Sequence, residues 1–388
     1  MSSTSTHQPT AHRPNLKRES LAILWIFVAV VLGSFAAASV DSAEAQAAES
    51  AAMSSAAPAD PMNVLGDAAC IKCHASEHAV WTATPHFRTF DELHRRPEAA
   101  KIAKDLGISS IKHGDRCVAC HYTQKPAGDS SSGDIETYVS VPSRPGHFEL
   151  EAISGISCES CHGAARNWLD VHHNYGGPNV TRQTETPQHR EERIARSVAL
   201  GMRNPHNVYL VAQSCYRCHT TGDEELVNVG GHPTGSLDFE FVSWSQGTVH
   251  HNFVRSDGKQ NEASSPHRLR FMFVAGVIAD TEASLRAVSS ATVKAEFGLT
   301  VAKRAARAGA RLKSVAGKVD DDRLNRAVEV FESVKIKLNN ADQLTNAADQ
   351  LARIGVEFAD AENNASEAAL HESLKSLDKF IPARKNWK

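Results

Sequence analysis

The sequence predicts a mainly α-helical fold in two parts. We expect short helices and loops over 63–275 and a bundle of longer helices over 276–388. Three observations predict this division. Gly and Pro are dense between Gly114 and Gly247, which leaves room only for short helices. All eight cysteines precede Thr220, and after Asp280 apolar side chains recur at helical spacing.

The amino-acid composition limits what can fill the protein interior and which partners the protein can bind. The 388 residues carry a net charge of −3, so no strongly basic surface predicts binding to nucleic acid. Aromatic residues make up only 6% of the chain. Because large aromatic side chains usually fill much of a core, aliphatic helices or groups other than protein must supply the interior here.

The N-terminus is expected to direct export. Lys17 and Arg18 precede an uncharged apolar run over 21–38, and A-x-A cleavage sites end at Ala38 and Ala45. Residues 1–40 therefore fit a signal peptide or an N-terminal membrane anchor, and residues 41–62 fit a flexible tether. In either case the rest of the chain would be periplasmic, secreted or anchored to the outer face of the cytoplasmic membrane.

Every cysteine belongs to one of four C-x-x-C-H motifs. The motifs are Cys70-Ile-Lys-Cys73-His74, Cys117-Val-Ala-Cys120-His121, Cys158-Glu-Ser-Cys161-His162 and Cys215-Tyr-Arg-Cys218-His219. Exported cysteines usually form disulfides, but a disulfide scaffold does not require His after every second Cys. A zinc site would bring C-x-x-C pairs together and leave the trailing His without a role.

This spacing suits covalent attachment of haem. Two cysteines three residues apart lie on one side of a helical turn, so their sulfurs can reach both vinyl groups of one haem as thioethers. The next residue then presents its imidazole to the iron as the proximal ligand. We therefore predict four c-type haems in a multihaem cytochrome c fold, in which the haems replace a conventional core.

Each iron also needs a sixth ligand or an open position. Methionine is scarce after the tether, where only Met202 and Met272 remain, whereas histidine is abundant. We therefore expect bis-histidine ligation, which gives lower reduction potentials than His/Met ligation.

Two stretches resemble a known family. The first motif is followed by Trp81-Thr-Ala-Thr-Pro-His86, and the third lies in Ser154-Gly-Ile-Ser-Cys158-Glu-Ser-Cys161-His162-Gly163, which continues to His172. These stretches are similar to the tetrahaem cytochrome c-554 family, over about Asp67 to Phe253. The resemblance implies an electron carrier, since that family accepts electrons from hydroxylamine oxidoreductase in ammonia oxidation.

The resemblance also implies distal ligands. It assigns His172 to the first haem, His86 to the third and His250 to the fourth, and it leaves the second iron five-coordinate. Several alternatives stay open. They are His173 for the first haem, His251 or His232 for the fourth, and His113 or His147 for the second.

Secondary structure between the motifs is expected to be sparse. The best helices are Pro97 to Leu106 and Glu191 to Leu200, and the possible strands are Phe239 to Trp244 and Leu269 to Val274. After Asp280, which can cap a helix ended by Gly298, four or five helices should pack as a bundle. The basic run Lys303 to Lys313 is interpreted as the solvated face of one helix.

Three functions fit these features. The first is an exported carrier that takes electrons from a redox protein donor and passes them to an acceptor. The second is an enzyme that acts on a small nitrogen or sulfur compound at an open second haem, although we identify no acid or base group beside it. The third is a subunit whose C-terminal helices form a homo-oligomer or dock to a larger complex.

Overall fold

The computed structural model describes residues 1–2, 57–113, 115–127 and 150–388. The chain divides into two compact units, Met1–Gln46 and Ala47–Lys388. The expected signal or anchor segment over 21–38 lies outside the described residues, as does nearly all of the expected tether. Within the described ranges, no helix is both long and apolar enough to cross a membrane.

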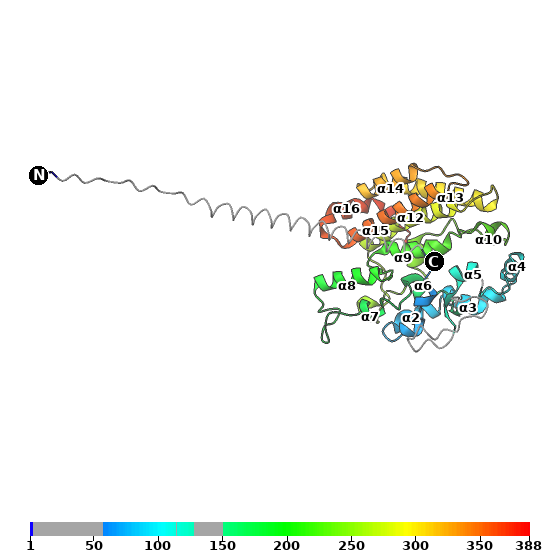
Figure 1. The fold of residues 1–388 in the computed structure, drawn as a ribbon, viewed down its shortest axis with the longest axis horizontal. Helices are drawn as coiled ribbons and strands as arrows, with labels where there is room; N and C mark the ends of the chain where they lie inside the picture. The colour runs from blue at the N-terminus through cyan, green and yellow to red at the C-terminus, as the bar shows by residue number, and fades with distance from the viewer. Residues whose placement is uncertain (3–56, 114, 128–149) are drawn as a thin grey trace. The chain divides into compact units, whose positions relative to one another are not determined.

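The motif-bearing part of the chain consists of short helices joined by loops (Figure 1). The α-helices are α2 (Ala75–Thr82), α3 (Pro85–Glu92), α4 (Pro97–Asp105), α5 (Asp115–His121), α6 (Cys158–His162), α7 (Leu169–His172), α8 (Pro187–Ala199), α9 (Val208–His219), α10 (Glu224–Asn228) and α11 (Phe241–Ser245). Short 3-10 turns lie at Pro61–Asn63, Asp67–Ala69, Leu93–Arg95 and Val254–Ser256. The predicted helices at Pro97 and Glu191 correspond to α4 and to the greater part of α8.

One small antiparallel sheet lies among these helices. Strand β1 (Thr123–Pro126) follows the second motif directly and pairs with β2 (Leu150–Ser154), which precedes the third motif. The register places Thr123 opposite Ser154. The Thr123 hydroxyl also donates to the Gly155 carbonyl at 2.8 Å and lies 2.9 Å from the Ser160 hydroxyl inside the third motif. The sheet therefore brings the second and third motifs close together.

Longer helices dominate the C-terminal part (Figure 1). They are α12 (Pro266–Ser289), α13 (Glu296–Ala316), α14 (Asp322–Glu332), α15 (Ala341–Asp360) and α16 (Ala368–Ser373), with 3-10 turns at Ala361–Asn363, Ala365–Glu367, Leu374–Phe380 and Arg384–Asn386. Helix α12 packs against α9, α13 and α15. The prediction of a mainly α-helical fold is confirmed.

Both predicted strands are wrong. Residues from Phe241 form α11, and Leu269 to Val274 lie inside α12. Ser265 caps α12 by accepting from the Arg268 amide, and Pro266 occupies the first turn, which is a strong start signal for a helix. Helix α12 is buried on nearly all sides, so it lacks the polar face by which periodicity identifies a surface helix.

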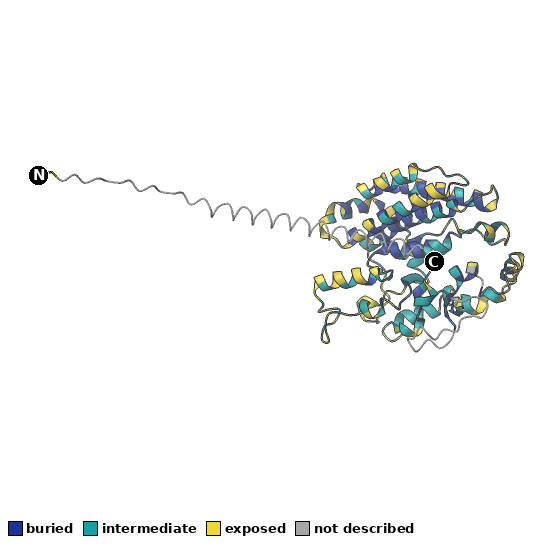
Figure 2. Cartoon of the chain, viewed as in Figure 1, coloured by how far each residue is buried: buried dark blue, intermediate teal, exposed yellow. Residues whose placement is uncertain are grey.

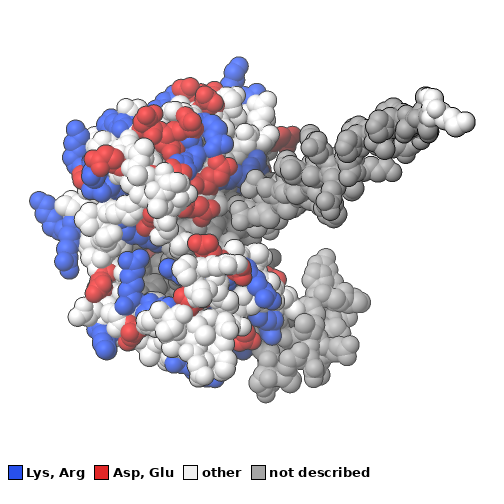
Figure 3. Space-filling view, turned by 90° about the vertical axis from the view of Figure 1, so that its left-hand side faces the viewer, with Lys and Arg blue, Asp and Glu red and all other residues white. Residues whose placement is uncertain are grey.

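Gly298 does not end a helix. It lies inside α13, where a Cβ atom would be 2.5 Å from the Val293 carbonyl oxygen. Glycine therefore serves close packing at this position. The basic run of α13 is also not simply solvated, because Arg304 is only 4% exposed and pairs with Asp280 at 2.8 Å. On the face shown in Figure 3, acidic and basic side chains are interspersed.

The apolar core extends across the expected domain boundary. Buried side chains form one cluster from Val208 on α9 to Leu377, and Figure 2 shows the buried residues concentrated in α9 and the C-terminal helices. The expected boundary between 275 and 276 falls inside α12. Because α12 packs on the helix that carries the fourth motif, the C-terminal helices and the motif region share one interior.

Candidate haem-binding site

The histidines of the four motifs lie at the ends of short elements. His121, His162 and His219 are the last residues of α5, α6 and α9, and His74 immediately precedes α2. Gly163 follows His162 with a left-handed φ of 87°, and a Cβ there would lie 2.2 Å from the Gly201 carbonyl oxygen. Only glycine fits this turn without strain.

Each of these four imidazoles faces a second imidazole from a distant part of the chain. Ring centres are separated by 6.1 to 6.4 Å. The pairs are His74 with His172 (6.4 Å), His121 with His232 (6.1 Å), His162 with His251 (6.1 Å) and His219 with His86 (6.2 Å).

These separations fit one metal between each pair of rings. A metal–imidazole bond is about 2 Å long, and the ring centre lies about 1 Å beyond the bonded nitrogen, so two rings on opposite sides of one metal are about 6 Å apart. Direct ring stacking would bring the centres closer than this. The residues present therefore fit an iron held between two histidines at each motif.

Burial favours the neutral form of five of these imidazoles. It lowers the pKa of His121, His162 and His219 to about 4 each, and it also lowers the pKa of His86 and His172. A neutral imidazole has a free nitrogen lone pair, which is the form that binds a metal.

His172 ends α7 and is held by its surroundings. The Trp168 ring meets it edge-on with centres 5.2 Å apart, and Arg193 of α8 donates to its carbonyl oxygen at 2.6 Å. Its Nδ1 atom lies against the Leu169 carbonyl oxygen, which directs Nε2 away from its own helix. Its alternative, His173, has an exposed side chain that also contacts Leu169.

His86 lies in the first turn of α3, which Thr84 caps by accepting from the Phe87 amide. The Ile156 amide donates to the His86 carbonyl oxygen at 3.1 Å, and a Cβ at Gly155 would be 2.3 Å from that oxygen. The resemblance implied that His86 serves the third haem. The structure instead turns its ring toward His219 of the fourth motif.

The adjacent residues His250 and His251 have different surroundings in the structure. The ring of His251 faces His162 of the third motif, and its Nδ1 lies 2.6 Å from the Val249 carbonyl oxygen. The Nε2 atom of His250 is buried without a hydrogen-bond partner. The doublet was assigned to the fourth haem from sequence, whereas the structure places His251 opposite the third motif.

The cysteines of different motifs meet in pairs. The thiols of Cys70 and Cys158 are within hydrogen-bonding reach of each other, and so are those of Cys120 and Cys218. The first motif therefore adjoins the third, and the second adjoins the fourth.

Two arginines are enclosed beside the third and fourth motifs. The Nε atoms of Arg203 and Arg217 are buried without a hydrogen-bond partner. Burial, followed by repulsion from Arg217, lowers the pKa of Arg203 to about 10. Both guanidinium groups donate to backbone carbonyl oxygens, Arg203 to Ser160 at 2.9 Å and Arg217 to Ala119 at 3.1 Å, and neither has a carboxylate partner for its Nε atom. Haem carries two propionates, and guanidinium groups are suitable partners for such carboxylates. Neither arginine was singled out from sequence, because isolated arginines carry no spacing signal.

The third motif also contains a buried carboxylate whose role the sequence does not predict. Glu159, within the third motif, is only 1% exposed, and it accepts hydrogen bonds from the amides of Gly66 (2.7 Å) and Ala165 (2.7 Å). It thereby fixes the chain before the first motif to the chain after the third. Its position between the two cysteines of a motif gives no hint of this role.

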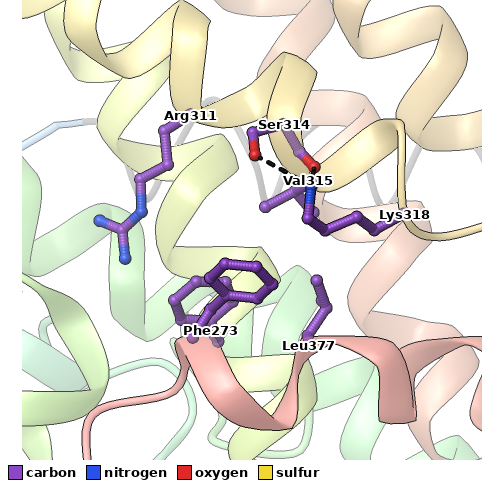
Figure 4. A pocket seen from close by; sticks show the side chains of 7 residues that line it. Phe273, Arg311, Ser314, Val315, Lys318 and Leu377 are labelled. Carbon is purple, nitrogen blue, oxygen red and sulfur yellow. Dashed lines mark hydrogen bonds between the residues drawn. The ribbon is translucent and has the colours of Figure 1, made fainter.

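One small pocket lies away from the motifs. Its lining comes from α12, α13 and the turn at Leu374–Phe380, and it contains no motif residue (Figure 4). Arg311 lies over the Phe273 ring there at 4.9 Å. Within the described ranges, no group of three or more His, Cys, Asp or Glu side chains could hold a bare metal ion.

Comparison with known proteins bears on the motif region. Residues 69–163 match the sequence model of a family described as cytochrome c554 and c-prime. Residues 69–163 are thus similar in sequence to the cytochrome c-554 family. A curated relative, cytochrome c-554 of Nitrosomonas europaea, is 26% identical over 125 residues, which are 32% of this chain and 48% of the relative. No solved structure matches.

The residues that match this family, 69–163, include the first three motifs. The chain spans about half the length of the curated relative that it matches. The resemblance expected from the sequence is confirmed, and it places the segment among c-type cytochromes, which hold haem through cysteine thioethers. The fourth motif and the C-terminal helices lie outside the family match over 69–163.

Proposed function

We propose that this chain is an exported tetrahaem c-type cytochrome that carries electrons between a redox protein donor and an acceptor. The observation that carries the proposal is the set of four facing histidine pairs, one at every C-x-x-C-H motif. Haem supplies a one-electron redox centre when bound, and two histidines hold its iron in the same coordination in both oxidation states.

The protein's own residues have three tasks in this proposal. The eight motif cysteines anchor the haems, His74, His121, His162 and His219 are proximal ligands, and His86, His172 and His251 are distal ligands to the fourth, first and third haems. Arg203 and Arg217 supply buried positive charge, which favours the reduced state of a nearby centre.

Proximity of the motifs supports transfer within the chain. The contacts between Cys70 and Cys158 and between Cys120 and Cys218 put the haem attachment points of different motifs side by side. Helix α6 packs against α9, which connects the two pairs. Electrons can therefore move among all four centres without passing through a long stretch of protein.

A count of haems tests the proposal. Protein matured in a host that attaches c-type haem should give four haems per chain in a pyridine haemochrome assay and an intact mass to match. Its thiols should resist alkylation. Fewer than four haems, or a free thiol in any motif, would contradict the proposal, and stepwise reduction in a potentiometric titration would support the carrier role.

A further inference from the structure

The second motif has a facing histidine that neither the family match nor the resemblance assigns. We infer that His232 is the distal ligand of the haem attached at Cys117 and Cys120, so that this iron has no open position. The inference rests on the proposed function, and it departs from the five-coordinate second haem that the resemblance implies. Its basis is the 6.1 Å separation of the His232 and His121 ring centres, at an angle of 51°.

The turn after α10 presents His232. Gly231 has a left-handed φ of 69°, which glycine adopts without strain and which reverses the chain at the end of the helix. The amide of His232 then donates to the Leu226 carbonyl oxygen at 3.1 Å. The Nδ1 atom lies 2.7 Å from the Pro233 carbonyl oxygen, so Nε2 is the nitrogen left for iron.

The proximal helix is tied to the distal one. Arg116, which directly precedes Cys117 on α5, pairs with Asp223 at 3.1 Å and also with Glu225. Both acids flank the start of α10, so the element carrying His121 and the element presenting His232 are joined by a charged bridge. Such pairs are individually weak at a surface, but two acids sharing one guanidinium restrict its position.

The C-terminal helices hold α10 from the other side. The Glu224 carboxylate accepts from the Thr292 amide at 3.0 Å and from the Val293 amide at 3.2 Å. The Asn228 side chain accepts from the Phe297 amide at 3.0 Å, at the start of α13. Helix α10 is therefore held at both of its ends, and the loop that carries His232 follows it directly. Preorganised ligation of a metal requires a ligand that is held in place in this way.

Among the alternatives that the sequence left open, His113 does not compete on these grounds. The His113 side chain is exposed, and its Nδ1 lies 3.0 Å from the Ser110 hydroxyl. His147 lies outside the described residues. His232 was considered for the fourth haem, but His86 takes the position opposite His219.

Spin state and carbon monoxide binding test the inference. Wild-type protein with four haems should be entirely low-spin when ferric and should bind no carbon monoxide when reduced. His232→Ala should gain one high-spin haem and one bound carbon monoxide per chain, whereas the control His113→Ala should behave as wild type. His232→Met should remain low-spin, with one haem shifted to higher potential.

The outcomes separate this inference from the proposed function. Fewer than four haems in the wild type would refute the proposed function. Four haems with one of them high-spin, or with one binding carbon monoxide, would refute the inference alone, as would a His232→Ala protein with four low-spin haems. If neither variant matures, near-infrared magnetic circular dichroism of the wild type decides, since it should report bis-histidine ligation at all four haems.

Discussion

The ring of His86 faces the ring of His219, with their centres 6.2 Å apart. His86 follows the first motif in the chain, whereas His219 belongs to the fourth. Thr89, one turn after His86, donates to the His121 carbonyl oxygen at 2.9 Å, so α3 also contacts the end of the second motif. Helix α3 thus contacts both the second and the fourth motif.

This pairing predicts which haem loses a ligand when His86 is removed. His86→Ala should convert one haem per chain to the high-spin form, measured by electron paramagnetic resonance of the ferric protein. In a Cys215→Ala/Cys218→Ala background, which lacks the fourth haem, the same substitution should produce no further high-spin haem. In a Cys158→Ala/Cys161→Ala background, it should still add one. The opposite pattern would assign His86 to the third haem.

The adjacent histidines 250 and 251 provide a matched pair. His251→Ala should yield one high-spin haem, because its ring faces His162. His250→Ala should keep all four haems low-spin. Optical spectra in the high-spin charge-transfer region distinguish the two proteins. Equal spectra of the two variants, or a high-spin haem in His250→Ala alone, would show that His162 and His251 are not the two ligands of one iron.

The Arg193–Glu185 pair should stabilise the first haem's distal ligand. Arg193 holds the enclosed Glu185 carboxylate by two hydrogen bonds of 2.7 Å and also donates to the His172 carbonyl oxygen. Arg193→Ala should lower the free energy of unfolding by about 1–3 kcal/mol, because it removes two charged hydrogen bonds and leaves the Glu185 carboxylate only its contact with His189 Nδ1 at 2.7 Å. Urea denaturation followed in the Soret band measures this, and Arg190→Ala, at an exposed position on the same helix, should change it little.

The same pair gives a dependence on pH. Hydrogen bonds from Arg193 lower the pKa of Glu185 below its ordinary value of 4.5. The folded state thus binds this proton less tightly than the unfolded state, so the pair's stabilisation is present above pH 4.5 and is lost as pH falls through the lower, folded pKa. Glu185→Gln should flatten the fall in stability below pH 4.5. An unchanged acid profile would show that Glu185 does not contribute.

Packing of α15 on α9 should matter for the fourth haem. A Cβ at Gly355 would lie 2.2 Å from the Tyr209 ring, on the helix that ends at His219. Gly355→Ala should therefore destabilise the fold by about 1–3 kcal/mol through overpacking. A Cβ at Gly317 would meet only the Lys313 carbonyl oxygen at 3.4 Å, so Gly317→Ala is the matched control. Equal denaturant midpoints for both variants would contradict this contact.

The local chemistry of the motifs follows from the amino-acid sequence alone. A C-x-x-C-H motif is one helical turn long, so its two thiols and its imidazole are placed together by the backbone alone. The motif positions, the mainly helical fold and the start of α4 at Pro97 follow from short-range signals of this kind. Strands were wrongly predicted at Phe239 and Leu269 because short apolar runs fit a buried helix equally well.

Which histidine faces which motif depends on the way the chain folds in three dimensions. Distal rings come from segments far along the chain, and their order in sequence does not follow their order in space, as His86 opposite His219 and His232 opposite His121 show. The same holds for the shared interior, because α12 buries one surface against α9 and another against α15. Contacts of this kind depend on how helices pack. The apolar periodicity of one helix shows which face is buried, but it does not identify the helix that packs on that face.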